Sequence, residues 1–113
     1  MSVEADRDGR DGEAQHIVAV DDGEVIGTCR LLIGGGVARL GRLVVERERR
    51  GHGVGEAILT EADRVASAAG CERIDLHAQT YAKQLYLVAG YAERGRTFVE
   101  EGIEHVAMEK RLA

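Results

Sequence analysis

A glycine-rich stretch is the part of this chain whose residue types and spacing best suit chemistry. It reads Arg50-Gly51-His52-Gly53-Val54-Gly55, after an apolar, β-branched segment at 40–45 and before a helical pattern at 57–69. A turn of this kind before a helix leaves backbone N–H groups without partners, and such groups bind phosphate or pyrophosphate. Glycine allows positive φ and keeps side chains away from the anion. The stretch therefore predicts a grip on the diphosphate of a nucleotide-bearing cofactor.

Two common phosphate loops do not fit this stretch. A Walker A loop requires a lysine directly after its last glycine, and a dinucleotide fingerprint requires a third glycine at position 56. Glu56 occupies that position. What remains is an R-x-x-G-x-G pattern at a helix start, formed by Arg50, Gly53 and Gly55. The alternative is a plain helix-capping turn in which Arg50 is only a solvated charge.

The elements that must position this stretch can be read from turn residues and hydrophobic periodicity. We expect strands at 16–20, 25–33 and 37–46, joined by the turns Asp22-Gly23 and Gly34-Gly35-Gly36, with a bulge at Gly27. An amphipathic helix at 54–69 leads to a strand at 73–78, which implies a right-handed parallel crossover. A second helix at 81–89 and a hairpin of strands at 92–99 and 103–110 complete the chain. The apolar stripe of the first helix comprises Val54, Ile58, Ala62, Val65, Ala66 and Ala69.

Length and composition limit the classes of protein that fit. The 113 residues suffice for one domain, which we place at 16–113 after a flexible acidic arm at 1–15. The net charge of −5 argues against nucleic-acid binding. No apolar run approaches the ~18 residues of a membrane span, so we expect no membrane partner. Cys29 and Cys71 form no metal or disulfide pattern, read as small core residues, and favour a reduced, cytoplasmic setting.

Three motifs in this order resemble the GNAT N-acyltransferase superfamily. They are R-x-x-G-x-G at the loop, A-x-x-L-Y-x-x-x-G-Y from Ala82 to Tyr91, and the closing hairpin at 98–108, which is most similar to the ElaA-like branch. The resemblance covers about residues 16–111. It implies an α/β (α+β) fold: a central mixed sheet with an antiparallel meander, then β-α-β-α-β-β, and a splayed parallel pair of strands at the cofactor cleft.

The resemblance also implies a cosubstrate and the residues that hold it. Acetyl-CoA would lie with its pantetheine arm along one strand backbone and its pyrophosphate on the loop amides, with an arginine near a phosphate. Tyr86 would stand near the thioester sulfur, although it also suits a half-buried packing role. The implied cofactor-binding residues are Leu43, Val44, Val45, Arg50, Gly51, His52, Gly53, Val54 and Gly55.

The acid and base of such a transfer can be weighed from pKa values. Proton transfer from a tyrosine with a pKa near 10 to a thiolate with a pKa near 8.5 is uphill by about 2 kcal/mol, so a strong hydrogen bond from Tyr86 is the alternative to full transfer. The attacking amine must lose a proton, and Glu46 could accept it through a water. His77 and His105 are open alternatives with pKa values closer to neutrality. Together with His16 and His52 they show no metal-ligand spacing, so we expect no metal.

The chain departs from the family at its beginning. The family's first strand and helices are absent, and residues 1–6 resemble the acidic loop that follows those helices. Either the chain is a minimal variant or its start lies downstream, and we expect a homodimer that completes the acceptor side. The acidic final hairpin, with Glu100, Glu101 and Glu104, favours a cationic amine as acceptor.

The function expected is acetyl transfer from acetyl-CoA to an amine, small or peptidic, by direct attack, with the backbone of Val44 or Val45 polarising the carbonyl. One alternative is a non-catalytic acyl-CoA-binding or regulatory module derived from an acyltransferase. A second is an inert structural dimer, which would show no thermal shift with acetyl-CoA.

Overall fold

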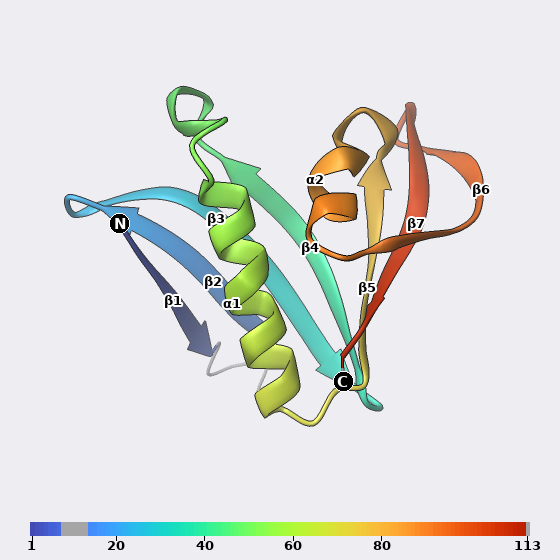
Figure 1. The fold of residues 1–113 in the computed structure, drawn as a ribbon, viewed down its shortest axis with the longest axis horizontal. Coiled ribbons are helices and arrows are strands. Elements are labelled where there is room, and N and C mark those ends of the chain that lie inside the picture. Colours follow the sequence, from blue (N-terminus) through green and yellow to red (C-terminus); the bar gives the residue numbers. More distant parts are fainter. Residues whose placement is uncertain (8–13, 113) are drawn as a thin grey trace.

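A seven-stranded mixed sheet organises the chain in the computed structural model, which describes residues 1–7 and 14–112. The strand order is β1-β2-β3-β4-β5-β7-β6, and all neighbours are antiparallel except β4 and β5. Both helices, α1 and α2, lie on the same face of the sheet (Figure 1). The strands are β1 (Ser2–Arg7), β2 (Ala14–Asp21), β3 (Glu24–Gly34), β4 (Val37–Val45), β5 (Arg73–Gln79), β6 (Ala92–Glu100) and β7 (Ile103–Arg111).

The predicted fold class and element order are confirmed. The meander β2–β3–β4 leads through α1 (Val54–Ala68) to β5, which pairs with β4 in parallel. The second helical segment is a 3₁₀ turn at Thr80–Ala82 followed by the short helix α2 (Lys83–Val88), where one helix at 81–89 was predicted. The final hairpin β6–β7 turns at Glu101 and Gly102, which both have positive φ, as a two-residue hairpin requires.

The prediction for the first residues was wrong in one respect. Residues 2–7, expected to belong to a loose arm in place of the family's first strand, form the edge strand β1, which pairs with β2 from Ser2↔Val20 to Arg7↔Gln15. Backbone hydrogen bonds hold this strand and Val3 packs against the core, and neither contribution is visible in a charge-rich composition. Residues 8–13 of the expected arm lie outside the described residues, and its boundary with the domain stays a prediction.

The core lies between the sheet and α1. Five of the six residues of the expected apolar stripe are buried, Leu59 joins them, and Ala69 is exposed at the end of the helix. A register shift opposite Ala19 and Val20 places the bulge of β3 beside Gly27, as predicted. Gly27 also allows close approach of α1, because a Cβ there would lie 2.8 Å from Ile58 Cδ1. No helix among the described residues is long and apolar enough to cross a membrane.

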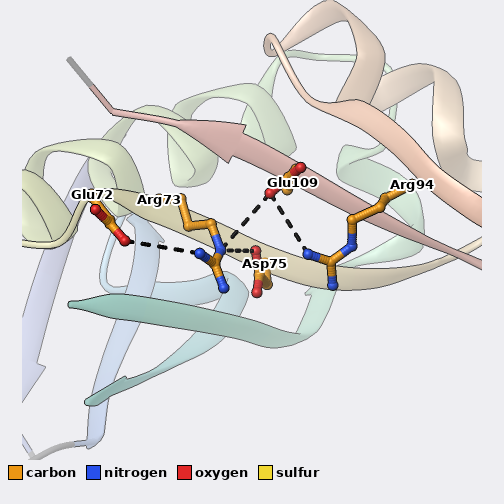
Figure 2. A network of polar contacts seen from close by, with 5 residues as sticks. All are labelled: Glu72, Arg73, Asp75, Arg94 and Glu109. Carbon is orange, nitrogen blue, oxygen red and sulfur yellow. Dashed lines mark hydrogen bonds and ion pairs between the residues drawn. The ribbon is translucent and has the colours of Figure 1, made fainter. Parts of the chain in front are cut away.

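The opposite face of the sheet is polar along β5 and β7. Side chains alternate along a strand, and Ile74, Leu76 and Ala78 of β5 point into the core. Arg73, Asp75 and His77 therefore project to the other face, where Arg73 pairs with Glu109 of β7 (Figure 2). We call this the open face, because both helices cover the other side.

Candidate active site

The glycine-rich loop connects β4 to α1 and leaves a series of amides unpaired. After a 3₁₀ turn at Arg47–Arg49, the chain passes Gly51 and Gly53, whose φ angles are 80° and 81°. A Cβ at either glycine would meet nothing within 4 Å, so backbone conformation and not crowding calls for glycine here. Among the described residues, no backbone carbonyl accepts a hydrogen bond from the N–H groups of 51–56, and the first helical bond runs from Ala57 to Gly53.

These amides border a small cavity, which we call the loop cavity. Its volume is about 260 Å³, and it lies at the N-terminus of α1, where the helix dipole favours an anion. The carboxylate of Glu56 lies at its edge and opposes that preference. His52 does not line the loop cavity and instead lines a different hollow beside Asp21 and Arg49. The lining residues are Val45, Arg50, Gly51, Gly53, Val54, Gly55, Glu56 and Leu85.

Arg50 is the arginine that the loop directs to this region. Its Nε donates to the carbonyl oxygen of Val45 at 3.1 Å, its two terminal NH₂ groups have no hydrogen-bond partner within residues 1–7 and 14–112, and its side chain lines the loop cavity. Arg49 is instead paired with Asp21 at 2.5 Å, and this hydrogen bond lowers the pKa of the Asp21 carboxyl. Of Arg47, Arg49 and Arg50, only Arg50 lines the loop cavity, where it could neutralise a phosphate beside the amides.

Gly55 has a different role from the other loop glycines. A Cβ at this position would lie 3.3 Å from Leu85 Cδ2, so the absence of a side chain lets α2 approach the first turn of α1. The contact sets the distance between the loop and the helix that carries Tyr86. Sequence reasoning predicted Gly55 as a cofactor residue and did not anticipate this packing.

A larger cavity, which we call the slot, opens where β4 and β5 diverge. The two strands pair only from Val37↔Arg73 to Leu40↔Leu76. Beyond Leu40, β4 has one extra residue against β3, because Arg30 pairs with Gly41 and Thr28 with Val44. This bulge bends the strand, and the slot beside it has a volume of about 720 Å³. Leu43, Val44, Val45 and Arg50 line it, so the expected pantetheine strand and loop arginine border one space.

Tyr86 lines the slot from the helical side of the sheet. It is 8% exposed, and its ring meets Tyr91 edge to face with centroids 5.8 Å apart. Burial, with a smaller contribution from Cys29, raises the pKa of Tyr86 to about 12. Proton transfer from such a group to a thiolate near 8.5 is uphill by about 5 kcal/mol, so the hydroxyl suits hydrogen-bond donation better than full protonation.

His105 lines the slot from the open face. Its Nδ1 lies 2.7 Å from the carbonyl oxygen of Ile103, which can only accept, so this nitrogen carries the proton and Nε2 of the neutral ring has a free lone pair. The ring is 8% exposed and stacks on Phe98 at 6.0 Å. Sequence reasoning named His105 only as an alternative base, because the stacking on Phe98 requires the β6–β7 hairpin to form and the contact with the carbonyl of Ile103 has no signature in the sequence.

The other candidate bases are less well placed. Glu46 is exposed and does not line the slot. Its backbone N–H donates to the carbonyl of Ile26, and its carbonyl accepts from the N–H of Arg49, so its backbone groups hold the turn after β4. His77 lines the slot, but its side chain is 45% exposed and its Nδ1 pairs with Glu100 at 3.2 Å.

The two cysteines are buried, as the sequence predicted. Cys29 belongs to the core, and burial raises its pKa to about 12. Burial also raises the pKa of Cys71. A thiol that stays protonated is a poor nucleophile, so neither cysteine is a candidate catalytic residue, and the candidates are the side chains that line the slot. No group of three or more metal-binding side chains occurs in the part of the chain that the structure describes, and the expected lack of a metal stays a prediction.

Comparison with known proteins shows the family to which this chain belongs. A profile of the acetyltransferase (GNAT) domain matches residues 2–112. The chain belongs to the GNAT acetyltransferase family. A Bacillus subtilis protein named as a candidate acetyltransferase is 33% identical over 100 residues, which are 88% of this chain and 68% of the relative.

Solved structures of GNAT proteins have the same fold. The structure of a Lactobacillus plantarum protein named as a candidate N-acetyltransferase superposes with a TM-score of 0.82 at 29% identity, over 94% of this chain and 75% of the other. Escherichia coli ElaA superposes with a TM-score of 0.80 at 23% identity, over 92% of this chain and 74% of its own. The GNAT resemblance drawn from the three motifs is thereby confirmed.

Proposed function

We propose that this GNAT protein transfers an acetyl group from acetyl-CoA to an amine. The observation that carries the proposal is the continuity of the loop cavity and the slot, which share Val45, Arg50 and Leu85 as walls. The amides of Gly51 to Gly55 and the free NH₂ groups of Arg50 would hold the pyrophosphate. The pantetheine would follow Leu43 to Val45, where no β5 residue pairs with β4.

The transfer would take place between Tyr86 and His105, which line the slot from opposite faces of the sheet. A neutral amine attacks the thioester carbonyl, the C–N bond forms, and Nε2 of His105 accepts the proton that the nitrogen sheds. As the C–S bond breaks, the hydroxyl of Tyr86 donates a hydrogen bond to the leaving thiolate, and a backbone N–H of Val44 or Val45 polarises the carbonyl. In this scheme His105 replaces Glu46 as the base.

The first test separates binding from turnover. We expect acetyl-CoA to raise the melting temperature, and an amine panel to release CoA thiol faster than acetyl-CoA alone does. Tight acetyl-CoA binding with no amine-dependent release across the panel would instead indicate a non-catalytic acyl-CoA-binding module. No thermal shift at all would contradict both readings and favour an inert structural protein.

The second test concerns the Tyr86 hydroxyl. Tyr86→Phe should lower kcat by about 100-fold while the affinity for acetyl-CoA is retained, since acid–base groups contribute about that much. Tyr91→Phe is the matched control, because the Tyr91 hydroxyl is also buried, has no hydrogen-bond partner among the described residues, and does not line the slot. Equal activity of the two variants would remove Tyr86 from the chemistry.

We also propose that the protein is a homodimer. The β6–β7 hairpin exposes Val99 at 74% and Ile103 at 40%, and β6 is an edge strand of the sheet. Exposed apolar side chains on an unpaired edge favour association. Sedimentation that shows only monomer at micromolar concentration would contradict this expectation. The cytoplasmic location stays a prediction from the cysteines.

A further inference from the structure

A second cavity, which we call the trough, lies on the open face next to the slot. Most of the charged side chains that line it are paired. Its volume is about 810 Å³. Arg73 pairs with Asp75 at 3.0 Å and with Glu109 at 3.8 Å, and Arg94 pairs with the same Glu109 at 3.7 Å (Figure 2). These charges hold strands together and are not free to attract a ligand.

The acidic hairpin is also partly engaged. Glu100 pairs with His77 at 3.2 Å, and Glu104 accepts a hydrogen bond from the Thr80 hydroxyl at 2.9 Å. Of the three glutamates that favoured a cationic acceptor, only Glu101 lacks an ion pair or hydrogen bond within the described residues, and it lines both the trough and the slot. The acidic lining is therefore weaker than the composition suggests.

The unpaired positive charges of the trough come from β4. Arg39 and Arg42 both line it, and neither side chain has an ion-pair partner in residues 1–7 and 14–112. Two unpaired arginines against one unpaired glutamate make this space attractive to a ligand with a negative group. Glu101, on the β6–β7 turn, contributes the opposite charge.

Arg42 is the residue that the backbone singles out. It belongs to the bulge of β4, and its φ of 55° is unusual for a residue other than glycine. Bulges near active sites redirect side chains, and a non-glycine residue in this conformation costs free energy that the surrounding structure must offset. Arg42 lines the slot as well as the trough, so it stands where an acceptor would meet the thioester.

We propose that the acceptor is an amine that also carries a carboxylate, such as a free amino acid. This inference rests on the proposed acetyl transfer. The guanidinium of Arg42, supported by Arg39, binds the carboxylate through charge-assisted hydrogen bonds, which a planar donor fork makes well. The carboxylate of Glu101 attracts the ammonium group, which loses its first proton to bulk water, and the neutral nitrogen then meets Nε2 of His105, which accepts the second proton after attack.

The experiment compares matched pairs of acceptors with the full chain and acetyl-CoA. Each free amino acid is assayed beside its methyl ester and the corresponding amine without the carboxylate. We expect kcat/KM to be higher for the free acids by roughly 10- to 100-fold, the value of hydrogen bonds to a charged group. Arg42→Gln should remove this preference, with the KM for acetyl-CoA unchanged. Arg96→Gln is the control, since Arg96 is exposed and lines neither the trough nor the slot.

Each other outcome overturns a distinct step. Equal or faster transfer to amines without a carboxylate would overturn the acceptor class and leave the acetyltransferase proposal intact. A raised KM for acetyl-CoA in Arg42→Gln would assign Arg42 to the cosubstrate and overturn the inference. Absence of transfer to every acceptor, with acetyl-CoA bound, would overturn the proposed function and with it this inference.

Discussion

The two faces of the sheet differ in what they bury. The covered face is apolar and packs against α1, as the close approach of Gly27 to Ile58 illustrates. On the open face, Arg73, Asp75 and Glu109 form a charged network. The difference teaches that the covered face stabilises the fold, whereas the open face is available for recognition. The slot joins them, because diverging strands let Tyr86 from one face and His105 from the other line one cavity.

The largest expected effect tests whether the open face supplies the base. His105→Gln should lower kcat by about 100-fold at neutral pH, because the ring nitrogen that accepts the proton is lost. Glu46→Gln should change kcat by less than about twofold, because a substitution at an exposed position away from the slot leaves the reacting groups in place. Steady-state thiol release measures both. A larger loss in Glu46→Gln than in His105→Gln would restore the carboxylate as the base.

A pair of glycine substitutions measures the contrast in packing. Gly27→Ala adds a Cβ 2.8 Å from Ile58 Cδ1 on the covered side and should lower the free energy of unfolding by about 2 kcal/mol. Gly41→Ala, where a Cβ meets nothing within 4 Å, should change it by less than about 0.5 kcal/mol. Urea unfolding gives both values. Equal losses would mean that the two faces are packed alike.

Alkaline pH should weaken the covered face selectively. Tyr86 has its pKa raised from 10.0 to about 12, and Cys29 from 9.0 to about 12, in both cases by burial. The folded state therefore binds these protons more tightly, and their contribution is intact below pH 9 and lost as the pH rises toward 12. At about 1.4 kcal/mol per pKa unit, the complete loss should be about 3 kcal/mol for Tyr86 and about 4 kcal/mol for Cys29. Thermal unfolding between pH 8 and pH 11 checks this, and a flatter profile in Tyr86→Phe would identify its share.

The smallest expected effect concerns the loop that joins the faces. Gly53→Ala forces a residue with a Cβ to adopt a φ of 81°. This costs about 1–2 kcal/mol and destabilises the loop conformation that presents the amides to the anion. We expect about tenfold weaker binding of acetyl-CoA by calorimetry. Gly95→Ala imposes the same strain at a φ of 79° in β6, away from the slot, and should leave this affinity unchanged.

The glycine loop of the candidate site was predictable from the sequence because its unpaired groups belong to the backbone. Glycine spacing before a helix indicates unpaired amides whatever the rest of the fold is. The order of the elements then predicts a parallel pair of strands beside the loop. The spacing of Arg50 from the glycines also predicted it beside the loop, and its side chain lines the loop cavity. The structure adds the Nε bond to Val45 and the packing of Leu85 on Gly55, which depend on segments far apart in sequence.

The proposed acceptor side was less predictable because it depends on which charges pair. Glu100 and Glu104 look free in the sequence, and only the fold shows His77 and Thr80 beside them. Arg42 has no signature in a strand pattern, since its bulge arises from register with β3. For the same reason β1 was missed: its partner strand, and not its own composition, makes it a strand.

The parallel contact between β4 and β5 has a mechanical consequence. Only four register pairs join the sheet half β1–β4 to the half that contains β5, β7 and β6. We expect a parallel contact this short to let the two halves move relative to each other, and a molecule bound in the slot beyond it would contact both strands and restrain that movement. A molecule bound in the slot should then slow amide hydrogen exchange in β4 and β5 together, and so stiffen the sheet as an added strand would.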